Sequence, residues 1–349
     1  RKRVRTYFTA AETRRRMTQM ITIATSVDPI VCATVLEARI RELRLIATKQ
    51  PRYNQQSKRP ERQTWLKLTA EAAPRLAIVR EVRDDVTDGA CYLGPFRSSA
   101  GAQEASEALQ FALPLRTCTT KLARNPRSTT AGCALAELGK CLAPCTATVD
   151  HEAYDSLVAR VRSAMSGAIG PVTEALQVRM RDLADQSRFE DAARWRDRLA
   201  HFVQASVRTH RLMMLAQIEQ LVAGKPTPAG GWEVHCISYG ALTGAITIPN
   251  GVDPLPAINA LIATADHISG PAPARVAGLT EEAQAILQWL ESDGVRLVRT
   301  SEPLALPIGC GGALLAQLGQ VRNEIRAQEP VDYQWLTASA RGKIVTRIA

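Results

Sequence analysis

The sequence predicts an α+β protein built from more than one domain. Apolar residues recur at helical spacing within residues 36–47 and 176–199, whereas short apolar runs at 64–70 and 232–238 are typical of strands. A chain of 349 residues is also too long for one ordinary hydrophobic core, and about two or three domains are expected.

The composition narrows the class of protein. Hydrophobic residues make up 46% of the chain and charged residues 22%, as in soluble globular proteins. No apolar run approaches the roughly 18 residues that a membrane helix needs, and no signal peptide precedes the fold. We therefore expect a cytoplasmic protein without membrane contact. Because the sequence starts at Arg1, within charged and helix-like sequence, we also expect a fragment whose N-terminus is missing.

Positive charge is concentrated at one end of the chain. Residues 1–62 carry fifteen Lys and Arg residues against five acidic ones, which accounts for the whole net charge of +10. Tyr7, Phe8 and Tyr53 are interleaved with them. Such an end predicts binding to a polyanion, most simply nucleic acid, and a ribosome-like basic tail is the alternative. The side chains expected to contact DNA are Arg1, Lys2, Arg5, Arg14, Arg15, Arg16 and Arg52.

Four elements are expected before residue 57. In order they are a helix at Arg1–Tyr7, a helix at Glu12–Ala24, a strand at Pro29–Val35 and a helix at Leu36–Lys49. In the last helix Leu36, Ile40, Leu43 and Ala47 share one face, which predicts packing against a core. Glu42 lies off this face, so the residues alone indicate an ordinary solvated glutamate.

The segments RKRVRTYF, VLEARIRELRLI and QPRYN follow one another within residues 1–57. In order and wording they resemble the second half of the GIY-YIG nuclease domain of the UvrC family of excinucleases. The resemblance covers residues 1–57 without large gaps. It implies a site arginine at Arg3, a metal-ligating carboxylate at Glu42 and a site amide at Asn54.

These residue types suit phosphodiester hydrolysis. The reaction needs a positive group for the developing charge, a carboxylate that holds Mg²⁺ or Mn²⁺, and a base that deprotonates water. In the family the base comes from the tyrosine-bearing GIY and YIG strands, which this sequence does not contain, and Tyr7 and Tyr53 are not at those positions. We therefore expect that this polypeptide alone cannot cut DNA.

Residues 58–170 are expected to form a linker and a cysteine domain. TWLKLTA and RLAIVREVR are strand-like, ACYLGPFRSS is interpreted as a Gly-Pro turn, and AGAQEASEALQFAL is a helix. YLGPFRSSAGA followed by LPLRTC resembles the linker between the nuclease domain and the cysteine region of the UvrC family. No catalytic role is expected here.

Four cysteines in this region, Cys118, Cys133, Cys141 and Cys145, are spaced C-x14-C-x7-C-x3-C. Without a secretory signal, metal binding or free thiols are favoured over disulfides. The paired C-x2-C of structural zinc sites is missing, and four thiolates without it also suit a cubane iron–sulfur cluster. The family has a similar quartet that ends in C-x3-C, which implies a [4Fe-4S] cluster. Zn²⁺ and unliganded buried cysteines are the alternatives.

Residues 171–210 predict a helical hairpin. Pro171 stands in the favoured first turn of a helix, and the bend falls at Ser187–Arg188. The wording ALQVRMRDLADQSRFEDAARWRDRLAHFVQ resembles a UVR motif, through which UvrB and UvrC recognise each other. It implies a UvrB-like partner, and a plain antiparallel helix pair is the alternative. The residues expected to contact the partner are Phe189, Glu190, Ala193, Arg196 and Asp197.

Residues 211–349 predict a small α/β domain. GGWEVHCISYG and ALTGAITIPNG read as a hairpin, 255–265 and 281–290 as helices, and GVRLVRT as a strand. A full-length UvrC protein carries a second, ribonuclease-H-like nuclease there, which needs clustered acidic residues. The strands here offer Glu233 and little else, so we expect a degenerate or structural domain. His235 and Cys236 alternate to opposite faces of a strand, which argues against a shared metal.

Two functions remain in competition. The leading hypothesis is a DNA-repair nuclease of nucleotide excision repair and the SOS response, which makes one metal-dependent cut near a lesion. Such a chain resembles the short single-incision homologue, or the C-terminal half of an exonuclease fused to a UvrC-like module. The rival is a non-catalytic adaptor that binds DNA and UvrB while another nuclease, such as a 3′–5′ exonuclease, performs the chemistry.

Overall fold

The computed structural model describes residues 15–53, 63–83, 85–122, 134–146, 151–270 and 280–305, together with most of 311–318. Within these residues the protein mixes helices with two antiparallel sheets, which confirms the α+β class. None of the described helices is both long and apolar enough to cross a membrane.

The first sheet has three antiparallel strands in the order β2-β1-β3. They are β1 (Thr64–Leu68), β2 (Leu76–Val79) and β3 (Cys91–Phe96). Alternation along β1 buries Leu66 and Leu68, and both lie in one core with Ala105 and Leu109 of α4 (Ser99–Ala112). Apolar and half-exposed residues therefore alternate as a sheet covered by a helix requires.

The Gly-Pro turn expected at ACYLGPFRSS is wrong, because most of this segment is strand β3. Pro95 has no backbone N–H, and Gly94 adopts a φ of +140° that favours glycine. The backbone of Gly94 bonds instead to Thr209, whose hydroxyl accepts from the Gly94 N–H and lies 2.8 Å from the Gly94 carbonyl oxygen. A helix thus takes the place of a neighbouring strand at this point.

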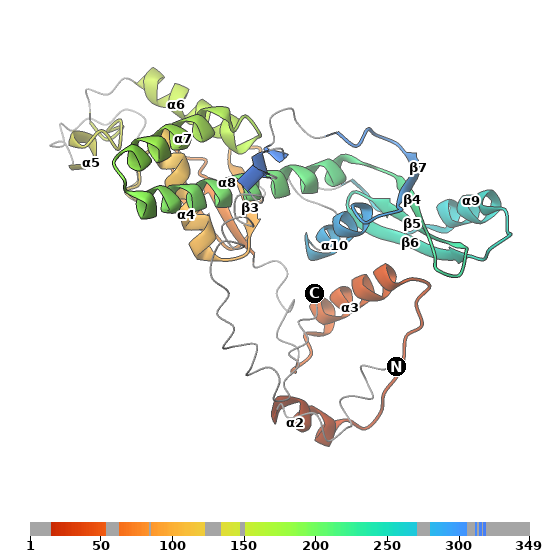
Figure 1. Ribbon diagram of the computed structural model, residues 1–349. Coiled ribbons are helices and arrows are strands. Elements are labelled where there is room, and N and C mark those ends of the chain that lie inside the picture. Colours follow the sequence, from red (N-terminus) through yellow and green to blue (C-terminus); the bar gives the residue numbers. More distant parts are fainter. Residues whose placement is uncertain are drawn as a thin grey trace.

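Between α4 and residue 220 the described residues form four further helices. They are the short α5 (Ala134–Glu137), α6 (His151–Met165), α7 (Gly170–Asp185) and the 29-residue α8 (Phe189–Gln217). Of these, α6, α7 and α8 share the core of the first sheet. Helix α8 is about 44 Å long at 1.5 Å per residue. Its first half packs with α4 and α7, and its last residues reach the second sheet, as Figure 1 shows.

The second sheet has the order β6-β5-β4-β7 and is antiparallel throughout. Its strands are β4 (Leu221–Pro226), β5 (Trp232–Ser238), β6 (Ala241–Ile248) and β7 (Arg296–Thr300), and its helices are α9 (Pro254–Thr264) and α10 (Thr280–Leu290). Cys236 packs with α9, whereas Ile237 packs with α8 and α10 on the other face. The hairpin, both helices and the last strand predicted here are confirmed.

At the N-terminal end, α2 (Arg15–Ile23) and α3 (Val35–Lys49) confirm two predicted helices. The strand expected at Pro29–Val35 is wrong: residues 24–34 form neither helix nor strand, and Val31 is 90% exposed. Ala33 instead donates its N–H to Glu37 at 2.6 Å and accepts from the Thr247 hydroxyl at 2.9 Å. The backbone N–H and carbonyl oxygen of Ala33 are therefore not free to pair with a neighbouring strand. The helix expected at Arg1–Tyr7 lies outside the described residues.

Candidate functional site

Helix α3 carries the predicted metal ligand. The hydroxyl of Thr34 caps its first turn by accepting from the Glu37 N–H at 3.1 Å, and Gln50 ends it in the left-handed conformation with a φ of 43°. Leu36 and Ile40 are buried as predicted. Leu43 and Ala47, predicted on the same face, are only half-buried, whereas Ile46 is buried.

Glu42 is exposed and points away from Leu36 and Ile40, at the edge of the face that buries Ile46. Its side chain is therefore open to solvent and to a ligand. Its two expected partners, Arg3 and Asn54, lie outside the described residues.

Two of the predicted DNA-binding residues lie close together. Arg15 of α2 and Arg52, just beyond α3, line one open hollow of about 420 Å³ with Gln19 and Tyr53. The Arg52 guanidinium stands 5.9 Å from the centre of the Tyr53 ring. A hollow with two cations and an aromatic ring can hold a phosphate and stack a base. The other predicted contacts, Arg1, Lys2, Arg5, Arg14 and the side chain of Arg16, lie outside the described part.

The cysteine region is organised around a buried arginine. Arg116 is 0% exposed and donates to the carbonyl oxygens of Ala73, Cys118 and Thr120 at 2.7, 2.9 and 2.9 Å. It also approaches the Cys118 sulfur at 3.5 Å and pairs with Glu71 at 3.1 Å. A buried cation thus stands beside the Cys118 thiol.

Cys118 and Cys141 also share a neighbour. Burial raises the pKa of Tyr154 to about 12, and both thiols add to the rise. Cys145 follows Cys141 in the same loop, and Cys133 lies outside the described residues. Among the residues that the structure describes, no three His, Cys, Asp or Glu side chains gather into a metal-binding group. The donor chemistry suits a thiolate-bound metal, and the four-cysteine site stays a prediction.

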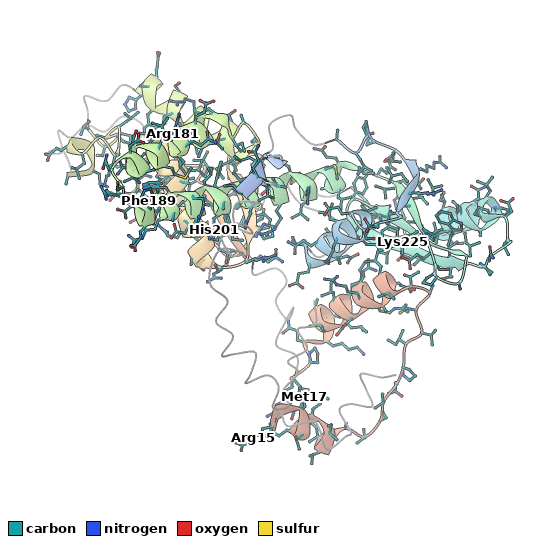
Figure 2. All side chains as sticks on the ribbon, viewed as in Figure 1. Arg15, Met17, Arg181, Phe189, His201 and Lys225 are labelled. Atoms are coloured by element: carbon teal, nitrogen blue, oxygen red, sulfur yellow. The ribbon has the colours of Figure 1, made fainter. Side chains whose placement is uncertain are left out.

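The predicted hairpin is present as α7 and α8, with Ser187 at the bend in the left-handed conformation. Phe189 is 67% exposed at the start of α8, beside an open groove of about 730 Å³. Figure 2 shows Phe189 and Arg181 on the two arms of the hairpin. The groove is lined by Gln177, Met180, Arg181, Ala184, Phe189, Ala192, Ala193, Arg196 and Leu318. Of the predicted contacts, Phe189, Ala193 and Arg196 line it, whereas Glu190 and Asp197 do not.

Sequence reasoning missed one charged pair, in which the carboxylate is buried and the arginine is partly exposed. Arg44 of α3 donates from Nε and Nη2 to the two carboxylate oxygens of Glu282 in α10, at 3.0 and 2.6 Å. This hydrogen-bonded contact raises the pKa of Arg44 above its ordinary value. A signal was present in the sequence, because Glu282 precedes Ile286 by one helical turn and so shares its buried face.

Known proteins match the chain in two blocks. A family model described as the UvrC-like GIY-YIG domain matches residues 1–55. A second, described as the UvrC/Cho excinuclease middle domain, matches residues 63–164. No solved structure matches the chain.

Two curated relatives extend these matches. A Mycobacterium tuberculosis protein, provisionally named a bifunctional exonuclease/endonuclease, is 37% identical over 341 residues, 96% of this chain and 52% of the relative. The UvrABC system protein C of Pediococcus pentosaceus is 30% identical over 211 residues, 60% of this chain and 34% of the relative. The chain thus spans about half the length of the first relative and a third of the second. From the two matched domains and these relatives, we conclude that the chain belongs to the UvrC family of excinuclease-type proteins.

Proposed function

We propose that this chain is part of a DNA-repair endonuclease that hydrolyses a phosphodiester bond near a lesion, with Mg²⁺ or Mn²⁺ held by Glu42. The observation that carries the proposal is the exposed carboxylate of Glu42 on a capped helix, inside the block that matches the GIY-YIG domain. An isolated exposed carboxylate is an ordinary surface group, and its setting in this block is what favours a ligand role.

The roles of the surrounding residues follow from their charge. A divalent ion, when bound, polarises the scissile phosphate and lowers the pKa of its bound water. Glu42 would hold it, Arg3 would offset the charge that develops on phosphorus, and the amide of Asn54 would hydrogen-bond within the site. Arg15 and Arg52 would bind the DNA backbone through the hollow that they line. The sequence holds no GIY or YIG motif, so its own cutting activity is expected to be absent.

Metal binding and cutting test this proposal separately. Mn²⁺ titrations followed by electron paramagnetic resonance should show one site that Glu42→Ala removes, and Glu174→Ala, an exposed glutamate on α7, should leave it intact. The complete gene product should nick lesion-bearing duplex DNA in a metal-dependent way. Metal-dependent nicking by this polypeptide itself, lost on Glu42→Ala, would overturn the expectation that it is inactive alone.

The adaptor function has its own supporting observation, the groove beside Phe189 with Arg181 and Arg196 on its sides. A UvrB-like partner would place apolar side chains in the groove and acidic ones beside the arginines. A pull-down with UvrB should weaken on Phe189→Ala and on Arg196→Glu. Val178→Ala, which trims an exposed apolar residue of α7 outside the groove, should not weaken it. Binding that survives the first two changes would count against this partner site.

The four cysteines are proposed to hold a [4Fe-4S] cluster, with Zn²⁺ as the alternative metal. Arg116 supports the cluster, since a cluster with four thiolates carries net negative charge that a buried guanidinium would offset. Anaerobic purification with an absorption scan and metal analysis distinguishes the alternatives. A colourless protein with stoichiometric zinc would exclude the cluster, and a metal-free protein would favour the third alternative, cysteines without a metal, of which Cys141 is buried and Cys118 exposed.

We propose four domains with the boundaries that the sequence predicts. Residues 1–57 belong to the GIY-YIG domain, 58–170 to the linker and cysteine domain, 171–210 to the UVR hairpin and 211–349 to the C-terminal α/β domain. The family-model matches to 1–55 and 63–164 support the first two. A cytoplasmic location stays a prediction.

A further inference from the structure

Helix α3 packs against elements from the C-terminal half of the chain. Leu36 and Ile40 belong to one buried cluster with Leu212 of α8, Ile237 of β5 and Ile286 of α10. Figure 1 shows α3 lying beside α10 and the edge of the second sheet, away from the first sheet. The helix that carries Glu42 therefore shares a core with the C-terminal α/β unit.

A polar contact fixes the middle of this helix. Glu282 is only 1% exposed, and its Oε1 accepts from the Leu242 N–H at 2.8 Å as well as from Arg44. Arg44 in turn donates to the Leu242 carbonyl oxygen at 2.6 Å. Leaving a buried carboxylate without its cation strongly destabilises the folded protein. Arrangements of α3 that separate Arg44 from Glu282 are therefore unfavourable, and the contact holds α3 in register against β6 and α10.

A second contact fixes the start of the helix. The capping hydroxyl of Thr34 lies 2.8 Å from Nε2 of His235 on β5, and the hydroxyl of Thr247 on β6 donates to the Ala33 carbonyl oxygen. Thr34 and Arg44 are ten positions apart, about 15 Å along a helix. Attachment at both points prevents α3 from rotating about its axis.

The orientation of Glu42 follows from this attachment. Glu42 precedes Arg44 by two positions, which places their side chains about 200° apart around the helix. While Arg44 is bound inward to Glu282, Glu42 must face outward to solvent, where the structure finds it.

We propose that the C-terminal α/β unit, β4–β7 with α10, is a scaffold that orients the Glu42 helix, and that Arg44 and Glu282 are its positioning residues. This gives the unit a role although its strands lack a second cluster of acidic site residues. The consequence for metal binding rests on the proposed role of Glu42, whereas the docking itself does not.

Hydrogen exchange on the whole chain tests the docking. In Glu282→Gln the amides of residues 36–49 should exchange at least about tenfold faster, because a charged hydrogen-bonded pair is lost. The amides of 64–96 should not change, which shows that the rest of the chain is folded. Glu291→Gln, which removes an exposed carboxylate paired with Arg211 at the end of α10, is the matched control. Unchanged exchange of residues 36–49 in Glu282→Gln would overturn the proposal.

A rescue and a metal titration complete the test. The double change Arg44→Met with Glu282→Leu replaces the pair by apolar side chains and should restore slow exchange in α3. Mn²⁺ affinity should fall in Glu282→Gln and recover in the double variant. If the amides of residues 36–49 exchange as fast in the double variant as in Glu282→Gln, the positioning role of Arg44 and Glu282 would be overturned. The proposed function fails separately, if Glu42→Ala leaves Mn²⁺ binding unchanged in an otherwise unaltered chain.

Discussion

Thr34 and His235 share a hydrogen bond of 2.8 Å across 201 positions of sequence, and both side chains are buried. The rings of His235 and Trp289 meet in a T-shaped contact with their centres 4.4 Å apart, and the Trp289 indole N–H donates to Glu233 at 2.8 Å. Nδ1 of His235 has no hydrogen-bond partner among the described residues. Burial lowers the pKa of His235 to about 4, so the folded protein keeps this ring neutral.

His235 should make the folded state sensitive to acid. In the unfolded chain the ring takes a proton near its ordinary pKa of 6.5, whereas the folded protein resists protonation until about pH 4. The free energy of unfolding should therefore fall as the pH drops through this window, by at most about 3 kcal/mol, and His235 should have no effect above it. Urea unfolding at pH 7.5, 6 and 5 measures the slope. His235→Gln should flatten it, whereas the exposed His201→Gln should not. Equal slopes in all three proteins would contradict the prediction.

The sequence predicted local features better than long-range ones. Alternation along β5 correctly separated His235 from Cys236, because a strand sends neighbouring side chains to opposite faces. Spacing in α3 correctly identified Leu36 and Ile40 as buried. Neither pattern predicts which part of the chain packs against these residues. Leu36 packs with residues near 212, 237 and 286, and the periodicity of one helix carries no information on such long-range contacts.

Arg116 shows a second limit of sequence reasoning. Arginine side chains are typically exposed. Arg116 is fully buried because the carbonyl oxygens of Ala73, Cys118 and Thr120 converge on it. Cys118 and Thr120 belong to the same loop as Arg116, whereas Ala73 lies between β1 and β2, and only the folded chain brings the two loops together. Spacing therefore predicted that Glu42 is exposed, while its role as a metal ligand stays a prediction, and the convergence of two loops on Arg116 could not be predicted from spacing.

Replacement of Arg116 by methionine should destabilise the cysteine region. The change keeps an apolar stem but leaves three carbonyl oxygens without their donor and removes a cation from Glu71, which keeps its ion pair with Arg75; the loss should cost about 3 kcal/mol. The free energy of unfolding in urea measures the loss, and faster amide hydrogen exchange of residues 116–122 reports the opened loop. Arg83→Met, at a side chain that is 72% exposed, should change neither quantity. A variant as stable as the parent would show that the buried guanidinium is dispensable.

The hydroxyl of Thr209 should contribute more than its size suggests, because it joins α8 to β3. It accepts from the Gly94 N–H and lies within 2.8 Å of the carbonyl oxygens of Gly94 and Ala205. Thr209→Val keeps the shape and leaves a buried N–H unsatisfied, so the free energy of unfolding should fall by about 1–3 kcal/mol. Thr264→Val removes an exposed hydrogen bond at the end of α9, so its free energy of unfolding should fall by less than about 0.5 kcal/mol. Similar losses in the two variants would contradict this role for Thr209.

The packing of the leucines that follow β7 should depend on Gly311. Leu314, Leu315 and Leu318 pack against the core of the first sheet and its helices, and Leu318 also lines the groove beside Phe189. Gly311 has a φ of +81°, and a Cβ there would lie 2.6 Å from Ile169 Cδ1 and 3.1 Å from Val203 Cγ1. Gly311→Ala combines an unfavourable backbone conformation with a collision, whereas a Cβ on the adjacent Gly312 meets no atom within 4 Å.

Gly311→Ala should therefore release this segment and Gly312→Ala should not. In Gly311→Ala the free energy of unfolding should fall by about 1–3 kcal/mol, and the amides of residues 314–318 should exchange faster. Because Leu318 forms part of the groove wall, the affinity of a partner that binds there should change as well. Peptide-level hydrogen exchange on the two variants measures the release. Equal exchange of residues 314–318 in both would mean that the close approach of Gly311 to Ile169 does not hold the segment in place.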